Sequence, residues 1–217
     1  MPVNPLKIGQ NETLLWYNCN VLKIVTAPNP VLSDIAKPVS KIDAPVIKII
    51  EEMKKTLVKA ADPKGVGLAA PQVGKPLRIF IAKPTDKSKI LVFINPEITE
   101  QSSELGYIKR PARRSLGEGG PKKDASKKAS KKLEGCLSLP TIWGPVLRAQ
   151  SLTISFLDEQ GIKHSKAFKG FMATIIQHET DHLNGILFPK RVLEQKGTLY
   201  KSHKNEKNED EFEEIEI

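Results

Sequence analysis

The strongest chemical signal in the sequence is the pentapeptide HETDH at residues 178–182. His178 and His182 are four residues apart, so on an α-helix both imidazoles lie on one face and can bind one metal ion. Glu179 lies beside them and can take a proton from a water molecule at that metal. The alternative is a surface helix that carries two unrelated histidines. The flanking residues are apolar, and buried histidines need partners, so the pattern predicts a metal site.

Two imidazoles do not complete a metal site, so a third protein ligand is needed. One group of HExxH proteins continues HExxHxxGxxH; Gly185 fits that pattern, but Phe188 stands where the third histidine belongs. Glu194 is a second candidate, although its surroundings, PKRVLEQKGT, read as exposed. Cys136, in LEGCLSLP, is the strongest candidate, because a thiolate is an excellent ligand for first-row transition metals. A lone cysteine in an apolar stretch can equally be a small core residue, so both interpretations remain open.

Residues 65–72 read GVGLAAPQ and form a third block of interest. Glycines let the backbone approach a ligand closely. The side-chain amide of Gln72 can donate an N–H to an oxygen that develops negative charge. On their own these residues are typical of an ordinary glycine-rich turn, so the block becomes informative only together with the other two.

The elements that must hold these residues follow from the hydrophobic spacing. The pentapeptide falls within a predicted helix from Phe171 to about Asn184, with Gly185 just past its end as a C-cap. A second, amphipathic helix is predicted for Ala44–Ala60. Predicted strands begin at Val21 and cover Leu77–Lys83, Ile90–Pro96, Val146–Asp158 and Ile162–Phe168. Because strands and helices do not alternate regularly, the expected fold class is α+β with antiparallel sheet.

The composition places the chain among soluble globular proteins. Its 217 residues, 39% of them hydrophobic and 27% charged, fit one domain with a proper core. Cys19 and Cys136 are too few for a disulfide scaffold. An apolar run of about eighteen residues, which a membrane-spanning helix needs, does not occur, and the N-terminus lacks the order of a signal peptide. We therefore expect a cytoplasmic protein without a membrane partner.

The net charge of +9 is concentrated in one segment. Residues 108–132 hold ten Lys or Arg against two acidic residues, a net charge of +8, and almost no apolar side chains. Such a segment cannot bury enough apolar surface to fold, so we predict a flexible basic insertion. It is either a solvated loop with no specific partner or an arm that contacts RNA phosphates. Residues 201–217 have the opposite bias, a net charge of −4, and are expected to form a frayed tail or a helix end that runs into one.

The three motifs GVGLAAPQ, EGCLS and QHETDH, in this order, resemble the peptide deformylase family. Its members remove the formyl group from N-formylmethionine at the start of nascent bacterial and organellar proteins. The resemblance extends from about Val21 to Phe188, apart from the basic insertion. It implies an α+β fold with antiparallel β-sheets around a central helix that carries HExxH. It also implies a hydrolase of protein biosynthesis that acts co-translationally and meets the ribosome transiently.

The resemblance further implies a role for each motif. Cys136, His178 and His182 would bind one metal ion, which in the family is Fe(II), although such a ligand set also accepts Zn, Ni or Co. Glu179 would be the general base and acid.

The remaining implied residues would stabilise charge and hold the substrate. Gln72 and the backbone N–H of Leu137 would form the oxyanion hole. The methionine side chain would lie in an apolar pocket lined by the HExxH helix and the segment Leu139–Trp143. The positions expected beside the metal site or along the substrate main chain are Val66, Gly67 and Gly135.

Several features depart from the family pattern. Residues 1–20 read as an N-terminal extension, 21–200 as one catalytic domain interrupted by the basic insertion 108–132, and 201–217 as a charged C-terminal tail. Trp143 stands where many members carry an Arg that helps to bind peptide. Arg148 aligns with an Arg for which we expect a structural role.

Two other functions compete with the deformylase hypothesis. Another HExxH metallopeptidase could cleave internal peptide bonds, and in that case Cys136 would not be a ligand. A non-enzymatic RNA- or ribosome-binding protein would depend instead on the basic residues of 108–132.

Overall fold

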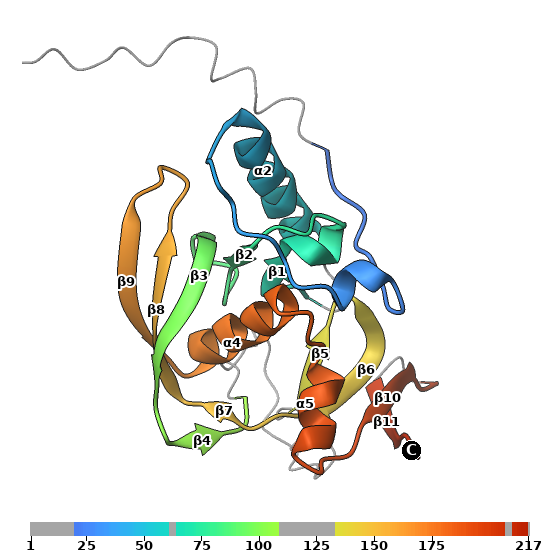
Figure 1. Cartoon of the computed structure of the whole chain (residues 1–217). Coiled ribbons are helices and arrows are strands. Elements are labelled where there is room, and N and C mark those ends of the chain that lie inside the picture. Colours follow the sequence, from blue (N-terminus) through green and yellow to red (C-terminus); the bar gives the residue numbers. More distant parts are fainter. Residues whose placement is uncertain (1–19, 61–63, 109–132, 207–209, 217) are drawn as a thin grey trace, which may run out of the picture.

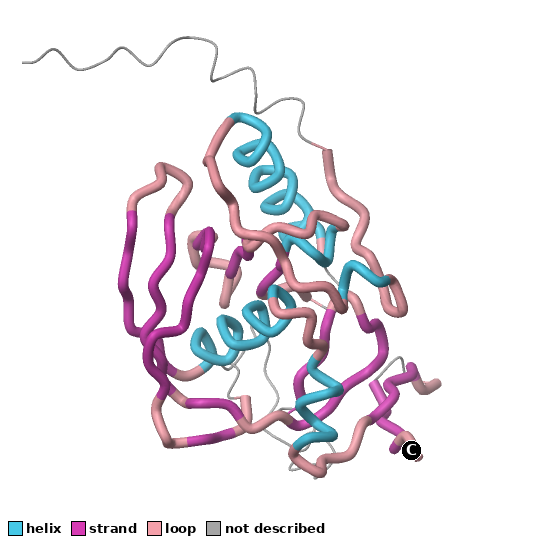
Figure 2. Tube along the Cα trace, viewed as in Figure 1, coloured by secondary structure: helices cyan, strands magenta, loops and turns pink. Residues whose placement is uncertain are grey.

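The computed structural model describes residues 20–60, 64–108, 133–206 and 210–216 (Figure 1). Its helices are α2 (Ala44–Lys59), α4 (Phe171–Leu183) and α5 (Phe188–Glu194), with short 3-10 turns η2 (Pro30–Leu32) and η3 (Ala70–Val73). The strands are β1 (Gly67–Ala69), β2 (Ile79–Ala82), β3 (Leu91–Gln101), β4 (Leu105–Gly106), β5 (Leu133–Cys136), β6 (Leu139–Pro145), β7 (Arg148–Ala149), β8 (Ser151–Leu157), β9 (Lys163–Lys169), β10 (Tyr200–Lys204) and β11 (Asp210–Glu214). Figure 2 shows how strands predominate over helices.

The strands form antiparallel sheets. The larger sheet has the order β1-β2-β3-β8-β9, a second has the order β11-β10-β6-β5, and β4 pairs with β7. Every pairing between these named strands is antiparallel. The chain is therefore a mixed α/β protein with antiparallel sheets and few helices, as the sequence predicted. At the far end of each larger sheet, β1 and β5 lie close to α4 (Figure 1).

Helix α2 forms where the sequence predicted it. It begins after Asp43, whose carboxylate accepts a hydrogen bond from the N–H of Val46 at 3.2 Å and so caps the helix. Its apolar face is buried against β1 and β2, with Ile50, Met53 and Leu57 inside the core. The burial of these side chains stabilises the contact of α2 with β1 and β2, at one end of the larger sheet.

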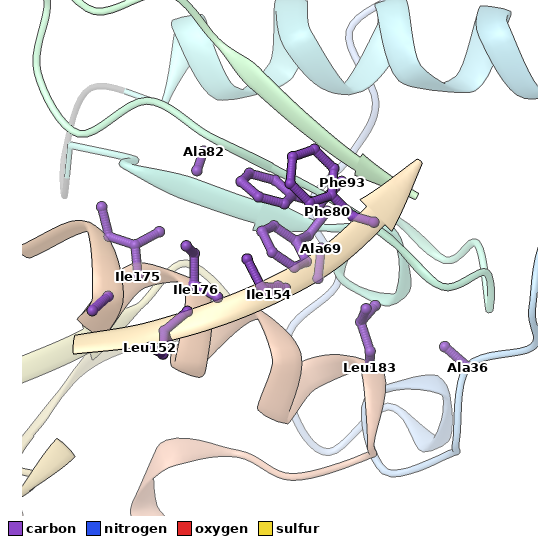
Figure 3. Close-up of a cluster of buried hydrophobic side chains, with 12 residues drawn as sticks. Ala36, Ala69, Phe80, Ala82, Phe93, Leu152, Ile154, Ile175, Ile176 and Leu183 are labelled. Carbon is purple, nitrogen blue, oxygen red and sulfur yellow. The ribbon is translucent and has the colours of Figure 1, made fainter. Parts of the chain in front are cut away.

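Helix α4 packs on the opposite face of the same sheet: Ile79 and Ile81 of β2 pack with α2, whereas Phe80 and Ala82 pack with α4. Ile175 and Ile176 point toward the aromatic rings of the sheet, among them Phe80 and Phe93, which stack with their centroids 4.5 Å apart (Figure 3). Leu183, at the end of the helix, belongs to the same buried cluster and lies near Ala36. The helix ends at Leu183, close to the predicted Asn184. Gly185 follows in the left-handed region (φ 69°). A Cβ there would overlap the carbonyl of Ser33, so only glycine fits.

The other predicted strands are found with shifted limits. Strands β2 and β8 lie within the predicted stretches, β9 ends one residue past its predicted stretch, at Lys169, and β3 continues beyond Pro96 to Gln101. Register shifts between Ile94 and Glu97 form a bulge there, which is where a sheet tolerates a proline. The predicted strand at Val21 is wrong: residues 21–26 form no strand.

Residues 21–27 instead form an extended strap, a segment without sheet pairing that bonds to the backbone at Gln72 and at Ser138. The N–H of Val25 donates to the carbonyl of Gln72 at 2.8 Å, and the N–H of Ala27 donates to the carbonyl of Ser138 at 3.0 Å. The prolines at 28 and 30 interrupt any longer pairing.

The C-terminal residues also differ from expectation. Instead of a frayed tail, β10 and β11 form a hairpin that extends the β5–β6 sheet through Tyr200 and Lys201 of β10. The N-terminal extension, Cys19 among it, and residues 109–132 of the basic insertion lie outside the described residues. Among the described helices, none has the length and apolar character needed to cross a membrane.

Candidate active site

Three potential metal ligands meet between α4 and β5. The Sγ atom of Cys136 and one ring nitrogen each of His178 and His182 all lie within 4.8 Å of one another. The Sγ atom lies 3.2 Å from Nε2 of His182. A buried thiolate and two imidazoles are a donor set that suits a first-row divalent metal. The cluster therefore fits the predicted metal.

The alternative third ligand, Glu194, is not part of this cluster. It lies on α5, where its carboxylate pairs with Nη1 of Arg191 at 3.0 Å, and its side chain is 46% exposed. Of the two candidates for the third ligand, Cys136 is the one that lies in the cluster, because β5 carries it to within reach of α4.

A buried carboxylate orients the first histidine. Nδ1 of His178 lies 3.0 Å from Oε2 of Glu134, so Nε2 is turned toward the thiolate. Both oxygens of Glu134 also accept hydrogen bonds from Arg148, at 2.7 and 2.9 Å. Burial opposes ionisation of Glu134, but the charge of Arg148 and its hydrogen bonds with His178 outweigh burial and hold its pKa at about 2. This carboxylate is therefore always charged at neutral pH.

The ion pairs continue outward from Arg148. Its Nη1 donates to Oδ2 of Asp181 at 2.9 Å, and Asp181 also accepts from Arg191 at 2.8 Å. Arg148 is 5% exposed, and although burial acts against its charge, Glu134 and Asp181 raise its pKa. This geometry agrees with the structural role that we expected for Arg148.

The two histidines have opposite electrostatic environments. Burial lowers the pKa of His182 well below its usual value, and the nearby charges of His178 and Arg148 lower it further. Burial also disfavours the charged form of His178, but its hydrogen bonds with Cys136 and Glu134 raise its pKa well above the usual value. In the described part of the chain, Nδ1 of His182 is buried without a hydrogen-bond partner. His182 is therefore a neutral imidazole, the form that binds metals.

Glu179 follows His178 on α4, and its carboxylate lies against Gly67 of β1. It is 4% exposed, and its Oε2 has no hydrogen-bond partner among the described residues. Burial raises its pKa to about 7, even though the positive charges of His178 and Arg148 act in the other direction. A Cβ at Gly67 would lie 2.7 Å from the carboxyl carbon of Glu179, so β1 can pass this close only because residue 67 is glycine.

Gln72 is held in one orientation beside Sγ of Cys136. Its Oε1 accepts the N–H of Ala69 at 2.8 Å, which fixes the orientation of the amide. Its Nε2 then faces Sγ of Cys136 at 3.3 Å and Oγ of Ser138 at 3.2 Å. The amide donor thus points into the cluster, where an oxygen of a bound substrate can reach it.

The remaining predicted residues surround the cluster. Leu137 follows Cys136 in the turn between β5 and β6. Val66 directly precedes β1, and its carbonyl accepts the N–H of Lys83 at 2.7 Å. Gly135 lies in β5, where the ring of Trp143 covers it. Because side chains alternate along a strand, Trp143 lies on the face of β5 opposite to Glu134 and Cys136, and not toward α4 as the predicted methionine pocket required.

Sequence reasoning missed two residues of the site, Glu134 and Ser138. Glu134 is two residues before Cys136, so on a strand the two side chains share a face. With Cys136 as a candidate ligand, this alternation predicts that the side chain of Glu134 points toward the same site. The contact of Ser138 with Gln72 spans 66 residues and left no local pattern in the sequence.

A mixed α/β fold with an HExxH helix and a nearby cysteine defines a metal-dependent hydrolase. The polypeptide deformylase family matches residues 21–197, and the chain belongs to that family. A peptide deformylase of Mesorhizobium japonicum is 37% identical over 168 residues, which cover 76% of this chain and 80% of the relative. One from Syntrophomonas wolfei subsp. wolfei is 36% identical, covering 81% of this chain and 95% of the relative.

Solved structures agree with the sequence relatives. The peptide deformylase of Thermotoga maritima superimposes with a TM-score of 0.64 at 32% identity and covers 79% of this chain and 97% of its own. A Met-ala-ser bound class I type b peptide deformylase from Acinetobacter baumannii gives 0.63 at 33% identity, with 80% and 99% covered. Enzymes of this family remove N-formyl groups from nascent peptides with the help of a metal. Membership of this family supports the deformylase hypothesis over the two alternatives, cleavage of internal peptide bonds and RNA binding without catalysis.

Proposed function

We propose that Cys136, His178 and His182 hold the catalytic metal of this deformylase and that the ion is Fe(II). The observation that carries the proposal is the approach of the three ligand atoms to within 4.8 Å of one another. Zn, Ni or Co would fit the same donors. When bound, such an ion polarises the formyl oxygen and lowers the pKa of a water molecule. All other steps depend on the side chains around it, with α4 as the central helix of the site.

Glu179 acts as the base and then as the acid. Its buried carboxylate, one oxygen of which has no hydrogen-bond partner in the described part of the chain, can take the proton of the attacking water. The water oxygen forms a bond to the formyl carbon. Glu179 then gives the proton to the leaving amine nitrogen as the C–N bond breaks, and formate departs. The close passage of β1 at Gly67 keeps the carboxylate in one position.

Gln72 and the backbone N–H of Leu137 stabilise the charge that develops on the formyl oxygen. The amide of Gln72 is oriented before substrate arrives, because Ala69 and Ser138 already bind it. Pre-oriented donors need no reorganisation during the reaction, and the loss of one such donor typically costs about 3 kcal/mol of barrier.

The substrate main chain lies between the segment before β1 and the edge of β5. Gly135 contacts it from β5, and Val66 contacts it through its N–H, because the Val66 carbonyl is engaged with Lys83. The Met-ala-ser complex of the Acinetobacter baumannii relative supports a peptide in this type of site. The methionine side chain packs against Val66 and the first turns of α4, where Phe171 and Ile175 share the face of the histidines.

The proposed setting is the cytoplasm, where the enzyme meets nascent chains at the ribosome. The catalytic domain spans 21–200, and the basic insertion 108–132 would contact ribosomal RNA. Deletion of 108–132 tests this contact: formate release from free peptides should persist while sedimentation with ribosomes decreases. Unchanged sedimentation would contradict the docking role.

The experiment for the catalytic assignment measures formate release from formyl-Met-Ala-Ser by anaerobically prepared Fe(II) protein. The native chain should release formate, Glu179→Gln should keep its metal without turnover, and Cys136→Ser should lose or change its metal. An exposed control, Glu97→Gln on β3, should behave as the native chain. No formate from the native protein would contradict the proposal, and an unchanged metal content in Cys136→Ser would remove Cys136 from the ligand set.

A further inference from the structure

The outer face of β5 carries an aromatic residue that the proposed mechanism does not use. Glu134 and Cys136 point from β5 toward the histidines of α4. Side chains alternate along a strand, so Gly135 between them faces the opposite side. Trp143, its partner across the β5–β6 pair, lies on that outer face. A Cβ at Gly135 would meet three ring atoms of Trp143 at 2.7, 2.8 and 3.0 Å, so the indole lies directly over Gly135.

Strands β10 and β11 hold this indole in place. Nε1 of Trp143 donates a hydrogen bond to Oγ of Ser202 on β10 at 3.0 Å. The ring of Phe212 on β11 meets the indole edge-to-face, with the centroids 5.9 Å apart and the planes at 83°. Both strands lie beyond residues 21–197, the part that matches the deformylase family. The ring is therefore positioned by a part of this chain that the family match does not cover.

The position of the ring matters because β5 is the last strand of its sheet. The order of the described strands is β11-β10-β6-β5, so a substrate chain along Gly135 would lie beside β5 as the next strand. Neighbouring strands are about 4.8 Å apart, and Gly135 has no side chain to separate the indole from that next strand. An outward side chain of the substrate would contact the ring.

We propose that Trp143 is a specificity-determining residue that reads the side chain directly after the formyl-methionine, and that Ser202 and Phe212 are its positioning residues. This inference rests on the proposed placement of the substrate along Gly135. With the methionine side chain turned inward to α4, alternation turns the second side chain outward to the indole. An aromatic ring favours a large apolar or aromatic partner by about threefold to tenfold over a small one.

The test compares kcat/KM for formyl-Met-Phe-Ser and formyl-Met-Ala-Ser. The native chain should prefer the Phe peptide about threefold to tenfold, through KM and not kcat. Trp143→Ala should bring the ratio close to one, and Trp143→Phe should keep part of the preference. The control Ile162→Ala, an exposed apolar residue at the β8–β9 turn, should keep the native ratio. Equal rates for both peptides in the native chain, or an unchanged ratio in Trp143→Ala, would overturn the proposal.

A binding measurement separates this inference from the catalytic one. In a Trp16→Phe background, Trp143 is the only tryptophan, so its fluorescence reports on the indole itself. Titration with the unformylated peptide Met-Phe-Ser should change the emission much more than titration with Met-Ala-Ser, and Ser202→Ala or Phe212→Ala should weaken the response. A missing response would overturn the role of Trp143 even where formate release is intact. Absent formate release with an intact response would contradict only the catalytic assignment.

Discussion

Two buried glutamates lie near the three candidate metal ligands, and their surroundings are opposite. Glu134 is held by Arg148 and His178, and its pKa is about 2. Glu179 lies against Gly67 of β1, its Oε2 has no hydrogen-bond partner among the described residues, and burial raises its pKa to about 7. The same functional group is thus a permanent charge in one place, and in the other it can gain or release a proton near neutral pH.

The pKa values of the two glutamates differ because Glu134 has charged and hydrogen-bonding partners, whereas burial dominates the surroundings of Glu179. A charged and hydrogen-bonded carboxylate can orient an imidazole but has little tendency to accept a proton. A buried carboxylate without a counter-ion is ready to gain and release one near neutral pH. In the proposed mechanism Glu134 orients His178 and Glu179 transfers the proton, so substitutions of the two glutamates should have different consequences.

The largest effect is expected for Glu179→Gln. The amide cannot accept the proton of the attacking water, so formate release should fall by about 10³-fold, within the usual range for a general base. Because the replacement is neutral and of equal size, neither metal content nor thermal stability should fall. Activity assays together with metal analysis check this. Retention of more than about a tenth of the activity would remove Glu179 from proton transfer.

Gly67→Ala should have the next largest effect on activity. The new methyl group would overlap the carboxylate of Glu179, and displacement of a catalytic group by about 1 Å can cost about 10²-fold in rate. The metal ligands are not touched, so metal content should stay constant. In a Glu179→Gln background the same change should cost far less. An equal cost in both backgrounds would show that Gly67 acts on something other than Glu179.

Glu134→Gln should act on the metal instead of on proton transfer. Removal of the charge that orients His178 should weaken metal affinity about 10-fold to 100-fold, as for other carboxylate partners of metal-binding histidines. Competition with a chelator measures the change. The matched control is Glu194→Gln at the outer end of the same ion pairs, which should leave the affinity unchanged. If both variants lose metal alike, the orienting role of Glu134 is wrong.

The smallest expected effect is a difference in acid stability. The pKa of Glu134 is lower in the folded protein than its ordinary value of 4.5. The ionised carboxylate therefore contributes fully to the free energy of unfolding above about pH 5, and this contribution is lost as the pH falls toward 2. Between pH 7 and pH 3 the native chain should lose about 2 kcal/mol more stability than Glu134→Gln. Urea unfolding of the metal-free proteins at both pH values measures this. A pH-independent difference would contradict the depressed pKa.

Much of the fold and of the candidate site could be predicted because the signals are local. The limits of α2 and α4 follow from hydrophobic spacing, from the capping residue Asp43 and from Gly185, all within the helices or next to them. His178 and His182 needed only the helical repeat. By contrast, the approach of Cys136 to His182 closes a gap of 46 residues. That contact could be expected from the family resemblance but not from spacing.

The failures have the same origin. The apolar run at Val21 resembles a strand, but its backbone bonds to Gln72 and Ser138 as a strap, a tertiary outcome that local propensity does not encode. The acidic C-terminus looked too charged to fold. It forms β10 and β11 because each lysine or histidine of one strand can face an acid of the other, as Lys204 and Asp210 do at 2.8 Å.

The shortness of β1 and β5 has a consequence for the range of proteins that the enzyme can process. In the described part of the chain β1 has three residues and β5 has four. In the proposed binding mode, strands of this length can contact only the first few residues of a bound peptide. Residues further along the substrate would not touch either strand, so the proposed site would accept peptides that differ widely beyond their first residues.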